Sequence, residues 1–141
     1  INTFGPLIVP PLFGSAFYIF LLRQFFLTLP IELDEAARLD GCSSFGILWR
    51  VVAPLSGAAL ATVALFSFIA HWNDFLGPLI YLNDLHKMTL AVGLQFFKGQ
   101  HTSDWHLLMA ASTGMVLPII VVFFFTQKLF IQGIALTGLK G

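Results

Sequence analysis

Charged residues and cysteine are scarce in this 141-residue chain, and both shortages narrow the class of protein. Only 10% of the residues are charged and 57% are apolar, whereas about a quarter of the residues in soluble domains are charged. This balance excludes an ordinary soluble domain and predicts an integral membrane protein. The net charge of zero suggests no nucleic-acid partner, and the single Cys42 allows neither an intrachain disulfide nor a cysteine metal cluster.

The sequence also lacks the short motifs that carry catalysis. It contains no GxxxxGKS or GxxxxGKT phosphate loop, no HExxH pair and no GxSxG elbow. We therefore predict no catalytic residue, no cofactor and no metal site, and any nucleotide must be bound by another subunit. No charged segment lies between Ile1 and the first apolar run, so we expect no signal peptide. We also expect that the chain begins within a longer protein.

Long apolar runs dominate what is present. They predict a single all-α transmembrane domain over residues 1–141, with spanning helices at about 11–27, 55–73 and 107–127. The polar stretches between them predict a loop at 29–55 and a second, outer loop at 83–106.

Proline placement shapes the two outermost helices. The first is expected to begin at Pro11 because paired prolines suit a helix start, with residues 1–10 as a turn or the end of an earlier helix. Arg23, near its end, can extend toward the lipid headgroups. Pro118 predicts a kink in the third helix.

The loop at 29–55 concentrates charge. Six charged residues lie in it: Glu32, Asp34, Glu35, Arg38, Asp40 and Arg50. Pro30 at an opening position, acidic residues in the first turns and Gly41 as a stop predict one short helix. Ser43 or Ser44 can cap a second helix that runs through Trp49, so we expect a bent helix pair on a membrane surface.

The basic residues give an orientation. Three helices place five of them on the side of the 29–55 loop (Arg23, Arg38, Arg50, Lys128 and Lys140) and two on the side of the outer loop (Lys87 and Lys98). By the positive-inside rule, the 29–55 loop and the C-terminus are expected in the cytoplasm.

The spacing within the loop resembles a known motif. Glu35-Ala36-Ala37 is followed by three residues, Gly41, nine residues and then Val51-Val52-Ala53-Pro54. This is similar to the EAA loop of binding-protein-dependent ABC importer permeases, with Val51 and Ala53 where Ile and Leu are usual. The stretches HWNDFLGPLIYL, TLAVGLQFF and QKLFIQGIALTGLKG are similar to the carbohydrate, maltose-type permeases, although the last departs in detail.

The resemblance implies a fold and partners. It implies the C-terminal half of a six-helix permease whose short loop helix sits in a groove on a separate ATPase. The residues that match the coupling motif or lie beside it are Glu35, Ala36, Ala37, Arg38, Asp40, Gly41 and Pro54. The implied partners are ATP-binding subunits, a second permease subunit, an extracytoplasmic substrate-binding protein, a sugar substrate and the lipid bilayer.

Several residues have two readings. Trp72, Asn73 and Asp74 are either part of a substrate path, since aromatic and polar side chains recognise sugars, or headgroup-level residues at a helix end. The segment 99–105 either contacts a docked binding protein or is a plain connector. His86, His101 and His106 lack metal-ligand spacing and are expected to be solvated.

Two alternative functions stay open. The EAA loop is shared with importers of peptides, amino acids and anions, so the solute could belong to another class. A small membrane scaffold that works without an ATPase is the alternative from a different class of protein.

Overall fold

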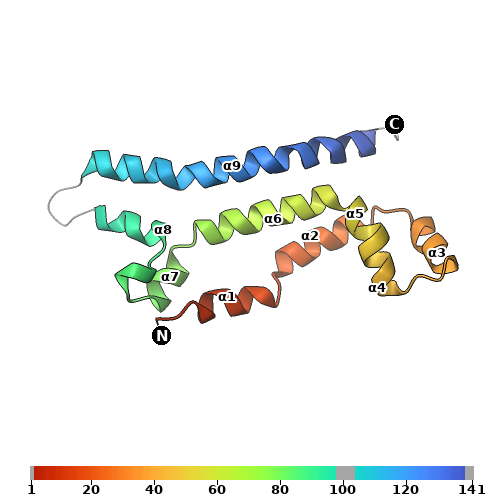
Figure 1. The fold of residues 1–141 in the computed structure, drawn as a ribbon, viewed down its shortest axis with the longest axis horizontal. Coiled ribbons are helices and arrows are strands. Elements are labelled where there is room, and N and C mark those ends of the chain that lie inside the picture. Colours follow the sequence, from red (N-terminus) through yellow and green to blue (C-terminus); the bar gives the residue numbers. More distant parts are fainter. Residues whose placement is uncertain (1, 98–103, 139–141) are drawn as a thin grey trace. The chain divides into compact units, whose positions relative to one another are not determined.

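The computed structural model describes residues 2–97 and 104–138, and within these ranges the chain is helical with no strand (Figure 1). The chain divides into two compact units. One unit comprises Ile1–Gly14 and Leu65–Phe125, and the other comprises Ser15–Ala64 and Thr126–Gly141. The single domain expected over 1–141 stays a prediction.

The N-terminal apolar stretch forms two helices, α1 (Gly5–Leu12) and α2 (Ala16–Phe26), rather than one helix from residue 11 to 27. Pro6 lies at the start of α1, where its missing N–H costs nothing, and the pair Pro10 and Pro11 lies inside it. Two missing backbone donors weaken the last turn, and Gly14, at φ +89°, turns the chain away from the helix. Of the two alternatives for residues 1–10, the turn does not hold for Gly5–Pro10, which are helical, and the predicted helix start at Pro11 is wrong. The stretch Gly5–Phe26 is long and apolar enough to cross a membrane.

A bent run of helices begins within the polar loop at 29–55. It consists of α4 (Ser44–Ile47), the π-helical segment η1 (Leu48–Val52), α5 (Ala53–Leu55) and α6 (Gly57–Trp72). The axis of Ser44–Leu55 meets that of Gly57–Trp72 at 81°. The bend lies beside Pro54, which has no N–H for a helical bond to the preceding turn.

Ser56 occupies the bend and is fully buried. Its backbone N–H donates to Val52 O at 3.0 Å, and its hydroxyl donates to the same oxygen at 2.6 Å. The backbone bond is an ordinary helical i→i−4 bond, and the hydroxyl adds a second bond to the same carbonyl, so the polar groups of the buried Ser56 are paired. The predicted helix at 55–73 is thus observed as Gly57–Trp72, with a sharp corner before it.

The first unit continues after α6 with four short helices, the last three of which lie within the predicted outer loop at 83–106. These are α7 (Leu76–Tyr81), η2 (Leu85–Lys87), α8 (Leu90–Gly93) and η3 (Leu94–Phe97). The segment is anchored by Asn2, whose N–H donates to Tyr81 O at 2.8 Å and whose side-chain oxygen accepts from the N–H of Asp84 at 3.2 Å. Burial of apolar side chains explains why this region folds, since Leu82 is only 1% exposed.

The last helix, α9 (Trp105–Gly138), is longer than the predicted 107–127. It continues through Pro118 and beyond Lys128, and Trp105–Lys128 qualifies as a membrane span by length and composition. The predicted end at residue 127 follows from Lys128, the first charge after the apolar run. A charge ends an apolar run but does not by itself end a helix.

Candidate functional site

The 29–55 loop builds a short helix, α3 (Ile31–Leu39), as the sequence predicted. Pro30 precedes it in an extended conformation with φ −60°, and Glu32 and Asp34 lie in the first turn, where the helix dipole favours anions. The Arg38 guanidinium reaches back one turn to the Asp34 carboxylate at 2.9 Å. Both side chains are partly exposed, so this pair contributes no more than about 1 kcal/mol.

Gly41 ends α3 by a backbone conformation that suits glycine. Its φ is +81°, its N–H donates to Arg38 O at 3.0 Å, and the next N–H, of Cys42, donates to Ala37 O at 3.0 Å. This pair of bonds is the Schellman motif, which satisfies the last helical carbonyls. The turn leads directly to Ser43, whose hydroxyl caps α4 by accepting from the N–H of Gly46 at 3.2 Å.

The two alanines of the motif lie on different faces. Ala37 is buried, at 8% exposed, in the unit where α3 packs against α4 and η1, whereas Ala36 is exposed. The resemblance to the EAA motif places both alanines in the predicted coupling set. Ala37 instead allows close approach within the chain, because a larger side chain would push α3 away from α4.

Helical geometry defines an outward face opposite Ala37. Residues spaced i, i+3, i+4 and i+7 lie on one face of a helix, and in α3 these are Glu32, Glu35, Ala36 and Leu39. All four are exposed, and Leu39 is 89% exposed. We call these four residues the α3 outer face. Glu32 and Leu39 were not among the predicted coupling residues, although both lie in helical register with Glu35 and Ala36.

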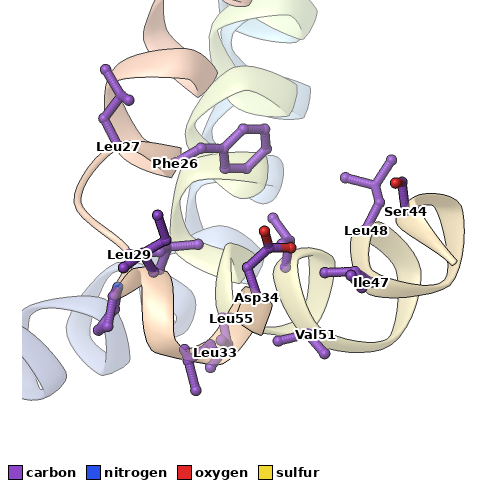
Figure 2. Close-up of a pocket in the computed structure, with 13 residues that line it drawn as sticks. Phe26, Leu27, Leu29, Leu33, Asp34, Ser44, Ile47, Leu48, Val51 and Leu55 are labelled. Atoms are coloured by element: carbon purple, nitrogen blue, oxygen red, sulfur yellow. The ribbon is translucent and has the colours of Figure 1, made fainter. Parts of the chain in front are cut away.

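A groove of about 460 Å³ lies on the other side of α3. Its walls come from the end of α2, the start of α3 and the run α4–α5, and they include Phe26, Leu27, Leu29, Leu33, Ile47, Leu48, Val51 and Leu55. Figure 2 shows Asp34 as the charged side chain among these apolar groups. The groove was not predicted, since it depends on how three elements separated in sequence pack together.

The structure separates Pro54 from the rest of the predicted coupling set. Glu35, Ala36, Ala37 and Arg38 lie on α3 and Asp40 caps its end, whereas Pro54 lies in α5 at the 81° bend. The motif therefore spans a short surface helix at one end and a sharp bend at the other.

The predicted substrate-path residues follow one another at the end of α6, and their side chains have different roles. The Trp72 indole stacks on Phe68 with ring centroids 5.6 Å apart, and its N–H donates to the carbonyl of Met115 in α9 at 2.9 Å. Asp74 accepts a hydrogen bond from the N–H of Gly77 at 3.2 Å and so caps the start of α7.

Asn73 lines a cavity in the first unit. A cavity of about 390 Å³ lies between the end of α6, the segment α8–η3 and the first turns of α9. Its lining residues are Asn73, Phe75, Ala91, Leu94, Gln95, Leu108, Met109, Ser112 and Met115. Gln95 and Ser112 were not predicted, because their elements meet Asn73 only through the tertiary fold.

The structure describes two of the three outer histidines. His86 and His106 are exposed, while His101 lies outside the described residues, as does most of the segment 99–105. In the ranges 2–97 and 104–138 no three His, Cys, Asp or Glu side chains gather into a metal-binding group.

Comparison with known proteins decides the family. Residues 2–136 match the family described as "Binding-protein-dependent transport system inner membrane component". The chain belongs to this family of transport permeases. The match confirms the predicted all-α membrane fold and the resemblance found from the EAA spacing.

The chain is also similar to permease subunits of named transport systems. The chain is 36% identical to the arabinooligosaccharides transport system permease protein AraQ of Halalkalibacterium halodurans, over all of this chain and 50% of the relative. It is 38% identical to the probable ABC transporter permease protein YurM of Bacillus subtilis, over 99% of this chain and 47% of the relative. It is 39% identical to the sn-glycerol-3-phosphate transport system permease protein UgpE of Shigella flexneri, over 88% of this chain and 45% of the relative. The chain thus spans about half the length of the relatives it matches.

Proposed function

We propose that this chain is the coupling half of a membrane-spanning subunit of an ATP-driven sugar importer, with ATP hydrolysis carried out by a separate subunit. Membership of the permease family and relatives named for arabinooligosaccharides and starch degradation products support this function. The observation that carries it is α3, a short capped helix that projects an exposed face from a loop between apolar helices.

The α3 outer face has the chemistry of a docking surface. Leu39 offers an apolar side chain, Ala36 leaves room for a partner backbone, and two carboxylates flank them. Arg38 is paired with Asp34, and within the described part of the chain the Glu35 carboxylate has no ion-pair partner. Glu35 is therefore available to donors on an ATPase groove, and burial of Leu39 there would contribute roughly 1.5–3 kcal/mol.

A displacement of α3 would pass to the membrane helix α6 through the elements that connect them. The Schellman turn and the packing of α3 on α4 and η1 hold α3 against the helix that leads to α6. The corner at Pro54 and Ser56 then converts displacement of α4–α5 into tilt of α6, as in hinge-type transitions. Closure of an ATPase dimer would in this way change access to the transport path.

The orientation and partners are part of the same proposal. The 29–55 loop and the C-terminus face the cytoplasm, where five of the seven basic residues lie under the three-helix topology. A second permease subunit completes the path, and an extracytoplasmic substrate-binding protein delivers the sugar to the opposite side. The words "binding-protein-dependent" in the family description support the second of these partners.

Substitution of the outer face tests the docking role. In the full-length permease, Leu39→Asp should weaken binding of the purified ATPase at least about tenfold, because roughly 1.5–3 kcal/mol of apolar burial is lost. Arg50→Gln is the matched control, since Arg50 is an exposed charge of the same unit outside α3, and it should change binding less than twofold, or about 0.4 kcal/mol. Normal ATPase binding and normal uptake by Leu39→Asp protein would refute the assignment.

A further inference from the structure

The cavity at the end of α6 has polar groups that the local structure leaves available. Asn73 uses its amide N–H in a bond to Ile69 O at 2.9 Å, which leaves its side-chain oxygen to accept. The Ser112 hydroxyl donates to Leu108 O at 2.7 Å and keeps its lone pairs. Within the described part of the chain the Gln95 carboxamide has no hydrogen-bond partner, and it is exposed.

The lining carries no charge. None of the described residues that form its wall is Asp, Glu, Lys, Arg or His. The neighbouring carboxylate, Asp74, is turned to the N–H of Gly77, where it caps α7. A charged solute would lose hydration here without gaining a counter-charge, which is costly, whereas hydroxyl groups can exchange water for amide and hydroxyl partners.

The remaining wall is apolar and deformable. Phe75, Met109 and Met115 supply an aromatic ring and two flexible thioethers, which suit the C–H faces of a sugar ring. The volume of about 390 Å³ falls in the range of roughly 300–1,000 Å³ that is typical of small-molecule sites.

We infer that this cavity is a subsite for an uncharged saccharide, with Gln95, Asn73 and Ser112 as the groups that bind its hydroxyls. The inference rests on the proposed sugar-import function and refines it, since it separates neutral sugars from anionic solutes such as glycerol 3-phosphate. Trp72 and Asp74 are positioning residues: one ties α6 to the α9 wall through Met115, and the other holds the start of α7.

Protection from thiol labelling tests the subsite directly. The full-length complex carries Cys42→Ser and either Gln95→Cys or, as the control, Leu85→Cys, a position that is 69% exposed and outside the cavity. Maleimide labelling is measured without binding protein, in the presence of arabinotriose, maltotriose or glycerol 3-phosphate. A saccharide at twice its Kd leaves one site in three free, so labelling of Gln95→Cys should slow about threefold, while Leu85→Cys is unaffected.

The outcomes separate this inference from the proposed function. Unprotected Gln95→Cys in a complex whose parent imports the same saccharides would overturn the subsite and leave the import function standing. Equal protection by glycerol 3-phosphate would overturn the preference for uncharged solutes. Failure of the parent, with its binding protein, to import any saccharide would overturn the proposed function itself.

Uptake kinetics provide a second readout. Gln95→Leu removes the carboxamide but keeps a side chain of similar size, so the KM for saccharide uptake should rise about two- to tenfold, the effect of one lost hydrogen bond. Leu85→Ala should leave this KM unchanged. An unchanged KM in Gln95→Leu protein would count against hydroxyl recognition by Gln95.

Discussion

Replacement of Gly41 tests how far one backbone angle controls the docking helix. The Cβ of an alanine at this position would have no atom within 4 Å, so the substitution creates no clash. The φ of +81° is nevertheless a left-handed conformation that L-residues adopt with difficulty. Gly41→Ala therefore changes conformational energy alone, which makes it a clean perturbation.

The magnitude follows from two routes open to the variant. Alanine can stay left-handed at a cost of about 1–2 kcal/mol. Alternatively, the turn can open and lose the two Schellman bonds, from Gly41 to Arg38 O and from Cys42 to Ala37 O, each worth about 0.5–1.5 kcal/mol. Because the variant takes the route that costs less free energy, the docking conformation is destabilised by no more than about 1–2 kcal/mol. This corresponds to a fall of about 5- to 30-fold in the population of that conformation.

The assay is equilibrium binding of the ATPase to the full-length permease in lipid nanodiscs. Gly41→Ala should weaken binding by up to about 5- to 30-fold, and Gly41→Asn should weaken it less, because asparagine tolerates left-handed φ. Gly46→Ala is the control in the same unit, since its Cβ would make an ordinary 3.4 Å contact with Ser43 Oγ. If Gly46→Ala weakened binding as much as Gly41→Ala, or Gly41→Ala bound normally, the argument from φ would be wrong.

Three other substitutions test local contacts. Pro54→Ala restores a backbone N–H and should reduce the 81° bend, which spin-label distances between α4 and the first turns of α6 would report; an unchanged distance would show another cause. Trp72→Phe removes the indole N–H that donates to the α9 backbone, so the free energy of unfolding should fall by about 0.5–1.5 kcal/mol. The KM for sugar should stay unchanged, and a raised KM without a loss of stability would contradict the positioning role. Gly77→Ala places a Cβ 2.5 Å from an Asp74 carboxylate oxygen, so thermal unfolding should show a destabilisation of about 1–3 kcal/mol. Gly93→Ala is the control in the same measurement, because its Cβ would have no atom within 4 Å.

Features encoded by adjacent residues were predicted well. Pro30, the acidic first turn and Gly41 predicted a short helix with a defined end, and α3 is found there. These signals act within one or two turns, so no distant contact is needed to decide them. The double proline misled the prediction for the first helix, because Pro10 and Pro11 were assigned to a helix start although they lie within α1.

Features that depend on packing could not be predicted. The EAA spacing identified Ala36 and Ala37 together but did not show that α3 turns Ala37 inward and Leu39 outward. Likewise, Trp72 and Asp74 had the composition of a sugar site, yet their hydrogen bonds hold α9 and α7. The partner of Trp72 is 43 residues away in the sequence, so no local pattern contains it.

The sequence by itself determined that this is a membrane permease with a polar loop between apolar helices, because apolar composition and motif spacing are properties of the chain that need no packing. Tertiary structure decided which face of α3 is free, where the chain turns through 81° and which side chains meet around the neutral cavity. The physical reason is that burial and hydrogen bonding between distant segments assign each side chain to one partner, and only the folded chain brings those partners together.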